Sequence, residues 1–381
     1  MLKGIHLTLM IGPLVPILVP APQVVMDSLT NVEVTTSDKG PSGFQLSFSL
    51  SNKSLLQTLF LLSGGGPLLF LRVVIVVTMN GTPDVIMDGV ITNHQLMPGG
   101  DTSHSTLTIT GKDLTAAMNL QDFSGFPFPA VPAEGRVALL LLKYAILGIV
   151  PLIVPSILID IQIPTNSIQA QQGTDIAYIK ALANRVGYVF YIDPGPVPGV
   201  NKAYWGPQIK LGVPQPSLNL NMDAHSNVEQ LSFKFDNKKN KIPTVFIYNE
   251  LTGAVIPIPI PPITPLSPPL GLIPPLPTSL FDLKPVSRSL SKRTIPAAIM
   301  IGLAKAAQWA EAVTGEGSLD VVRYGRLLKA RQLVGVRGVG PAFDGLHYVT
   351  SVTHKIKRGE YKQSFKLSRN GLISTLPRLL S

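Results

Sequence analysis

The residue types that most often do chemistry are few and scattered in this sequence. Cysteine is absent, which excludes a disulfide, a thiolate nucleophile and a cysteine-ligated metal. The sequence also has no G-x-S-x-G nucleophile elbow and no GxxxxGK[ST] phosphate loop. The six histidines lack the HExxH spacing of a zinc-binding helix and stand at positions 6, 94, 104, 225, 347 and 354. We therefore predict no metal site, no cofactor and no enzymatic activity.

Acidic residues give no better catalytic candidate. Asp84 and Asp88 lie near each other in the sequence, as do Glu311 and Glu316. A carboxylate pair carries acid–base chemistry only when a substrate-binding arrangement with a base or nucleophile surrounds it. No such partner accompanies either pair, so both are interpreted as surface or turn residues.

Basic residues are the remaining candidates, and they indicate a binding surface rather than a reaction. The net charge is +10, and residues 281–381 hold 17 Lys and Arg against 6 Asp and Glu. Such a surface meets an acidic protein, an anionic lipid or nucleic acid, or it simply faces water. No aromatic-interleaved basic motif accompanies it, so no specific nucleic-acid site is predicted. The candidate interface residues are Arg323, Arg326, Lys355, Lys362 and Lys366.

Three of these residues lie in the most strongly patterned stretch, Leu346 to Arg369. Apolar and polar side chains alternate on both sides of a charged turn, Lys357–Glu360. This period of two, interrupted by a glycine-containing turn, predicts a β-hairpin with one core face and one wet face that carries ammonium groups. Upstream, Leu319–Leu328 is predicted to be a strand, and residues 335–346 a glycine-punctuated loop.

The N-terminal part of the chain has the same strand signature. Phe44–Ser51 alternates apolar and polar residues, which is typical of a half-buried strand. Leu68–Thr78 is a continuous β-branched run, typical of a strand buried on both faces. Several strands at this spacing favour a barrel or a sandwich.

Helices are predicted between these strands and the C-terminal hairpin. Thr174 is expected to cap a helix that ends at Gly187, and a strand follows at 188–193. The alanine-rich stretch Pro296–Val313 is expected to form a second helix, with Gly315 as its stop.

Two apolar stretches resemble membrane or targeting segments, and a third is rich in proline. Prolines interrupt residues 1–20, which favours an N-terminal arm or strand over a signal peptide. In residues 136–163, Lys143 and two prolines leave no uninterrupted run of about 18 apolar residues. We therefore predict a buried helix at 136–147, followed by an extended segment, and no transmembrane segment. The Pro-rich insertion 251–285 is expected to be extended, either as a solvated spacer or as an arm on a neighbouring subunit.

Several motifs resemble one known family. DVVRYGRLL and RQLVGVRGVGPAFDGLHYVTSVTHKIKRGEYKQSFKLSRNGL, in the C-terminal region, are similar to the C-terminal part of the late control protein D family. That family supplies the baseplate hub of contractile phage tails and related injection particles, and it is similar to the N-terminal part of VgrG spikes. DGVITNHQLMPGG and STLTITGKDL resemble its first tube-type barrel, and GTDIAYIKALANRVGYVFYIDPGP is typical of its small α/β domain.

The resemblance implies an α+β, mainly β fold with two tube-type β-barrel domains and a small α/β domain between them. The expected domains are an N-terminal arm and first barrel at 1–115, the α/β domain at 116–215, and a second barrel at 216–381 that carries the insertion. The resemblance further implies a homotrimeric ring that joins a threefold spike to a sixfold inner tube. Its partners would be a spike protein, an inner tube protein and other baseplate proteins, and the basic residues would contact acidic partners or line a channel.

The composition fits this resemblance. Only 14% of residues are charged and 45% are hydrophobic, as in a subunit whose surface is largely covered. A membrane-associated or pore-forming β-protein stays open as the alternative, and a tail-attached cell-wall hydrolase is a weaker one. We expect assembly in the bacterial cytoplasm, in a phage tail or an injection particle that is either released or membrane-anchored. No spike domain follows Arg369, so a separate protein is expected to provide the tip.

Overall fold

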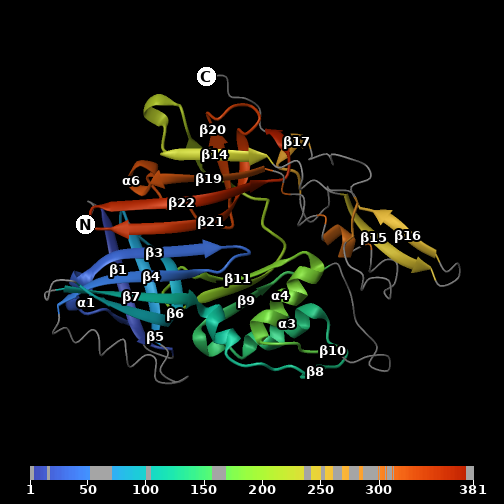
Figure 1. Ribbon diagram of the computed structural model, residues 1–381, viewed down its shortest axis with the longest axis horizontal. Coiled ribbons are helices and arrows are strands. Elements are labelled where there is room, and N and C mark those ends of the chain that lie inside the picture. The colour runs from blue at the N-terminus through green and yellow to red at the C-terminus, as the bar shows by residue number, and fades with distance from the viewer. Residues whose placement is uncertain are drawn as a thin grey trace.

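The computed structural model describes residues 4–14, 18–51, 71–99, 104–156, 169–235, 242–249, 254–260, 268–273, 283–285, 299, 301–304, 306, 311 and 313–374 (Figure 1). These residues form a mainly β molecule with a few short helices, as the sequence predicts. Strands from both ends of the chain share one large sheet, and a small α/β region lies beside it.

The large sheet is one antiparallel path through eleven strands, and two further strands branch from β21, one pairing with it directly and the other through the first. Its order is β14 (Gln230–Phe235), β19 (Val313–Asp320), β22 (Glu360–Arg369), β21 (Gly345–Lys357), β3 (Leu29–Ser37), β4 (Gly43–Ser51), β7 (His104–Asp113), β6 (Thr82–Pro98), β5 (Leu71–Met79), β1 (Ile5–Pro13) and β2 (Val19–Pro20). The attached strands are β20 (Leu333–Arg337), which pairs with β21, and β13 (Gln215–Asn219), which pairs in parallel with β20. The N-terminal arm is thus a strand of the body, because β1 pairs with β5 along its whole length.

The N-terminal and C-terminal strands of the sheet meet where β3 pairs with β21. This contact runs from Ser37 opposite Ser351 to Asn31 opposite Lys357 (Figure 1). Strands predicted to belong to two separate barrels are therefore continuous in one sheet. Closed barrels are not seen among the pairings of the described strands. The domain boundaries and the trimer remain predictions.

The C-terminal hairpin is confirmed. Lys357 pairs with Glu360 across a loop of two residues, Arg358 and Gly359. Gly359 has a φ of +81°, which a residue with a Cβ adopts only with strain. The alternate side chains of β22, Tyr361, Phe365 and Leu367, are buried as the alternation predicts.

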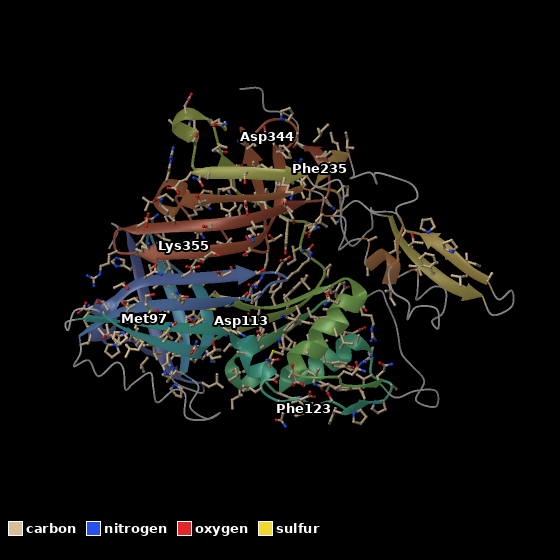
Figure 2. The ribbon with its side chains drawn as sticks, in the orientation of Figure 1. Met97, Asp113, Phe123, Phe235, Asp344 and Lys355 are labelled. Carbon is tan, nitrogen blue, oxygen red and sulfur yellow. The ribbon has the colours of Figure 1, made fainter. Side chains whose placement is uncertain are left out.

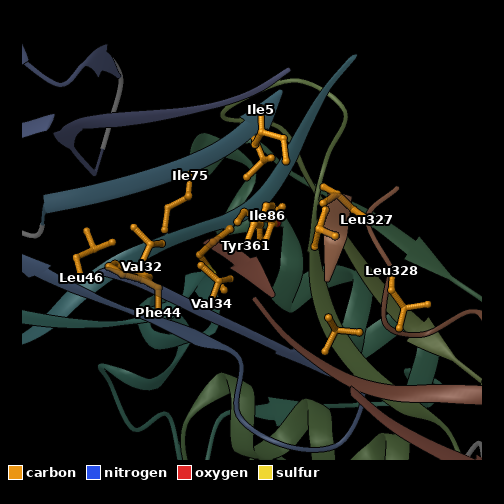
Figure 3. Packing of buried hydrophobic residues seen from close by; sticks show 14 of the residues in the cluster. Ile5, Val32, Val34, Phe44, Leu46, Ile75, Ile86, Leu327, Leu328 and Tyr361 are labelled. Carbon is orange, nitrogen blue, oxygen red and sulfur yellow. The ribbon is translucent and has the colours of Figure 1, made fainter. Parts of the chain in front are cut away.

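One hydrophobic core lies behind this sheet and draws on both ends of the chain. Val32, Val34, Phe44, Leu46 and Ile75 come from the N-terminal strands (Figure 3). Tyr361, Leu327 and Leu328 reach the same cluster from the C-terminal region (Figure 3). Burial of such side chains contributes about 1.5–3 kcal/mol each, so neither half of the sheet has a full core without the other.

The α/β region is built around a second core that includes Trp205. Its elements are η2 (Leu114–Asn119), β8 (Pro127–Phe128), α3 (Ala133–Leu142), η3 (Ala145–Leu147), β9 (Ile149–Ile153), β10 (Gln169–Ala170), α4 (Asp175–Val186), β11 (Val189–Pro194) and β12 (Asn201–Gly206). Helix α4 confirms its prediction, since Thr174 Oγ1 accepts from the Ala177 N–H and Gly187 ends it at a φ of +78°.

The helix predicted at 136–147 is present as α3 and η3, and the extended segment that follows is β9. Across the described ranges, none of the helices has the length and hydropathy that crossing a lipid bilayer requires.

Two predictions near the hairpin are wrong. The predicted strand Leu319–Leu328 ends at Asp320 and becomes helix α6 (Val321–Tyr324). The Asp320 carboxylate accepts from the Arg323 N–H at 3.0 Å, and Gly325 ends the helix at a φ of +79°. The predicted loop at 335–346 begins later, because residues 335–337 belong to β20.

The glycine expected to stop the second helix has another role. Residues 299, 301–304 and 306, which are the described residues of that stretch before Glu311, are helical, but Val313 already begins β19. A Cβ at Gly315 would meet the Phe233 ring at 2.6 Å. Gly315 therefore permits close strand packing and does not end a helix.

The proline-rich insertion contributes short strands. β15 (Ile242–Asn249) lies between β16 (Ala254–Pro259) and β18 (Leu283–Pro285), and β17 (Gly271–Ile273) pairs with β23 (Leu372–Ser374). Pro257 and Pro259 lie on β16, an edge strand, where a missing N–H is tolerated. The remaining short elements are α1 (Gln23–Ser28) and η4 (Asp223–His225).

Candidate interface on the polar face of the sheet

One face of the large sheet is polar over eight consecutive strands, from β14 to the second half of β6. Strand register places its side chains opposite one another, row by row, on the side away from the core. We call this surface the polar face. Its residues are Gln230, Ser232, Glu316, Ser318, Lys362, Ser364, Lys366, Ser351, Thr353, Lys355, Glu33, Thr35, Gln45, Ser47, Ser49, Thr106, Thr108, Thr110, Asn93 and Gln95.

Most charges on the polar face lie beside a charge of opposite sign, although Lys355 and Lys362 are also opposite each other. Lys355 is directly opposite Glu33 on β3, and Lys366 is opposite Glu316 on β19. Lys362 forms an ion pair with Glu229 at 2.9 Å, and this contact raises the pKa of the lysine. The rest of the face carries hydroxyl and amide groups. It is therefore a wet surface with little net charge.

The polar face is hollowed at its C-terminal end. A depression of about 520 Å³ is lined by Gln230, Ser232, Glu316, Ser351 and Lys366 among others. Behind it, the core side of the hairpin is fixed by polar contacts. The Gln363 side chain bonds both the N–H and the carbonyl of Leu328, at 2.9 and 2.8 Å. The surface is thus carried by a rigid support.

The structure brings together three of the five predicted residues. Lys355, Lys362 and Lys366 share the polar face. Arg323 and Arg326 do not, because α6 and the loop after it pack on the core side of β22.

Arg326 instead lines a separate depression of about 620 Å³, beside a Lys329–Asp84 ion pair of 2.6 Å. Arg323 and Arg326 were grouped with the three lysines because Leu319–Leu328 was incorrectly predicted to be a strand. Sequence reasoning also missed that β4 and β7 extend the same face. The alternating Ser and Thr residues of β4 and β7 can be recognised in the sequence, but the sequence does not show which strands lie beside them.

Among the described strands, the polar face ends in two strand edges that have no further strand partner. Strand β5 pairs with β6 only from Thr82 to Val90, so residues 93–98 pair with β7 alone among the described strands. At the other end, β14 pairs only with β19 in the same set. Apolar side chains are exposed at both edges, with Leu96 41%, Met97 58% and Phe235 36% exposed. Figure 2 shows Met97 and Phe235 on either side of Lys355.

Buried arginines attach the α/β region to the sheet. Arg331 donates to the carbonyl of Ser37 and to Asp193, and its guanidinium lies 3.9 Å from the Tyr191 ring centroid. Arg72 holds Asp88 through two bonds of 2.7 Å and also donates to the Leu147 carbonyl at 2.9 Å. These contacts fix the α/β region beside the N-terminal strands.

Within the described residues, no three His, Asp or Glu side chains come together in a way that could hold a metal ion. The buried histidines make protein contacts instead, since His354 Nδ1 lies 2.7 Å from the Tyr361 hydroxyl.

Comparison with family models finds no match, and no curated protein matches the sequence. Comparison with solved structures finds similar folds over nearly the full length. The tail protein from Neisseria meningitidis MC58 is 13% identical, with a TM-score of 0.65 over 96% of this chain and 97% of that chain. The 43 kDa tail protein of prophage MuSo2 from Shewanella oneidensis is 14% identical, with a TM-score of 0.58 over 96% and 97% of the two chains.

The fold of this chain is therefore similar to the fold of phage tail proteins. It also occurs within a larger chain. A structure of the Francisella PdpA–VgrG complex contains a chain that matches 100% of this one over 60% of its own length, at 11% identity and a TM-score of 0.60. At these identities the likeness is one of fold. It confirms the structural resemblance to phage tail and VgrG proteins that the sequence motifs predict.

Proposed function

We propose that this chain is the structural baseplate hub of a contractile phage tail or related injection particle, and that it works as a homotrimeric ring. The observation that carries the proposal is the eight-stranded polar face, whose two end strands lack a further partner among the described strands. An open edge presents unpaired backbone N–H and carbonyl groups, and soluble proteins normally cover or pair it. Here both edges also expose apolar side chains.

Pairing of β14 in one copy with residues 93–98 of β6 in the next copy satisfies both edges at once. Neighbouring strands alternate in direction from β14 to β6, and an even number of strands lets that alternation continue across the contact. The contact joins two different surfaces, so repeated copies close into a ring when the rotation between them is suitable. The polar faces of all copies then line one central channel.

A channel of this kind suits the passage of an extended polymer. Hydroxyl and amide groups with neighbouring charges of opposite sign keep the wall wet and offer no strong single-sign attraction. In the hub, each chain supplies two tube-like units. Three chains therefore present six tube-like units to an inner tube, and three copies of the whole chain to a spike. The partners of the ring are accordingly a spike protein, an inner tube protein and other baseplate proteins.

Introduced cysteine pairs test the ring directly, because the natural chain has no cysteine. Ser232→Cys on β14 is combined with Asn93→Cys, Gln95→Cys or Met97→Cys on β6, to sample the register. Strands in contact bring Cα atoms within about 4.4–6.8 Å, the range that a disulfide requires. We expect at least one pair to give a covalent trimer under oxidation, seen as a threefold mass on a denaturing gel.

A charge introduced at the edge tests the same contact by disrupting it. Met97→Lys is expected to convert the trimer to monomer in native mass spectrometry, since it places an ammonium group in the contact. Leu142→Lys is the control, because Leu142 is 62% exposed on α3, away from both edges. A wild-type chain that stays monomeric at high concentration, with no cysteine pair that cross-links, would disprove the ring.

A further inference from the structure

A pocket of about 380 Å³ lies where the sheet meets the α/β region. Its apolar walls come from separate elements, with Val90 on β6, Leu120 after η2, Ile176 on α4 and Phe190 on β11. The pocket borders the polar face, because Lys112 on β7 and Ser37 at the end of β3 also line it. Elements of the sheet and of the α/β region thus contribute to one cavity.

Two lysines give the pocket its chemistry. Lys112 is exposed on β7 and Lys180 is half-buried on α4. No hydrogen bond or ion pair joins either ammonium group to a described residue. Unpaired cations beside apolar walls are a favourable setting for an anion that brings apolar surface with it.

The one acidic side chain in the lining does not neutralise both lysines. Asp113 accepts from the N–H of Thr115 at 3.2 Å and from its hydroxyl, so the carboxylate is directed into η2. Burial raises the pKa of Asp113, although the positive charges of Arg331 and Lys180 act in the opposite direction. The lining therefore stays positive whether or not Asp113 is ionised.

We propose that this pocket binds a segment of a partner polypeptide that carries an apolar side chain next to a carboxylate. The volume suits one large aliphatic or aromatic side chain with its flanking backbone. Lys112 and Lys180, which both line the pocket, would hold the carboxylate. A polypeptide is favoured because the pocket opens beside the polar face, where a protein assembled with this chain would run. The choice of a polypeptide rests on the proposed function, whereas binding at the pocket itself does not require ring closure.

Two matched peptides test the proposal with the full-length protein. Acetyl-Leu-Leu-Glu-amide and acetyl-Leu-Leu-Gln-amide differ only in one carboxylate. Saturation-transfer NMR on the peptide methyl groups gives their dissociation constants. We expect the Glu peptide to bind at least about fivefold more tightly, as one charge-assisted contact allows. Higher salt should weaken the Glu peptide more than the Gln peptide.

Variants locate the binding. Lys112→Met and Lys180→Met keep most of the apolar stem, and each should reduce the preference for the Glu peptide. Lys202→Met, at an exposed position on β12, should leave it unchanged. The proposal is overturned if neither peptide binds below millimolar concentration, if both bind equally, or if Lys202→Met has the same effect as the pocket variants. The native mass of each variant reports separately on the ring.

Discussion

At the scale of single residues, a buried ion pair fastens the sheet to the α/β region. Arg72 and Asp88 face each other on β5 and β6, and both side chains are almost fully buried. Asn201 adds a bond of 2.8 Å to the same carboxylate from β12. Such a pair adds little to the free energy of unfolding compared with apolar side chains in the same place. Removing one partner lowers that free energy strongly, because the remaining charge stays buried alone.

Arg72→Met is therefore expected to lower the free energy of unfolding by about 3–5 kcal/mol. The double variant Arg72→Met with Asp88→Leu should recover most of that loss, since it buries no lone charge. Urea unfolding followed by circular dichroism measures both. Equal stability of the single variant and the natural chain would contradict the role given to this pair.

A buried histidine makes stability depend on pH. Burial lowers the pKa of His354 to about 4, whereas an unfolded chain keeps a value near 6.5. Between these values the unfolded state binds a proton that the folded state does not, so stability falls as the pH is lowered through this range. From pH 7 to pH 5 we expect His354 to account for a loss of about 2 kcal/mol.

His354→Gln should reduce this pH dependence, measured as the difference in urea midpoint between pH 7 and pH 5. His225→Gln is the control, because His225 is exposed on η4. His347, which burial also gives a pKa of about 3, accounts for a further share that the first variant leaves in place. An unchanged difference in the His354 variant would refute the assignment.

At the scale of elements, glycines allow two different things. Gly359 supplies the positive φ of the β21–β22 turn, and no atom crowds its missing Cβ. Gly111 lies inside β7, where a Cβ would stand 2.2 Å from the Phe44 ring and 2.6 Å from the Val90 carbonyl oxygen. The first position is constrained by backbone conformation and the second by close packing between strands.

Alanine at the two positions should therefore differ in cost. Gly359→Ala is expected to destabilise by about 1 kcal/mol, through left-handed strain alone. Gly111→Ala should cost about 3 kcal/mol or more, because strands β4, β6 and β7 must move apart. Thermal unfolding of both variants gives the comparison. A larger loss in Gly359→Ala would show that the close packing around Gly111 relaxes easily.

At the scale of the whole molecule, Arg331 joins three regions of the chain. It extends from the segment before β20 to the β3–β4 turn, where it bonds the Ser37 carbonyl and Ser42, and to Asp193 on β11. Arg331→Met keeps bulk but removes these bonds. We expect faster hydrogen exchange at residues 37–42 and in β11, with β22 unaffected. A uniform increase in the exchange rate across the chain, or no increase at all, would argue against a junction at this residue.

Local sequence determined the elements whose signals lie within one turn or one strand. The alternation around Lys357–Glu360 specified the hairpin, and Thr174 with Gly187 set the limits of α4, because the contacts responsible lie close in the chain. The same reasoning failed at α6, where the Asp320 cap and Gly325 were as local but were masked by an apolar, strand-like run.

Only the tertiary structure decided which strands are neighbours. Alternation tells which residues of one strand share a face, but it carries no information about the strand beside it. The Thr35 and Thr353 hydroxyls, 2.9 Å apart and 318 positions distant, bond because β3 pairs with β21. That pairing follows from burial of a core that both ends of the chain must complete. It turned separately predicted strands into one polar face, and it left Arg323 and Arg326 in another layer.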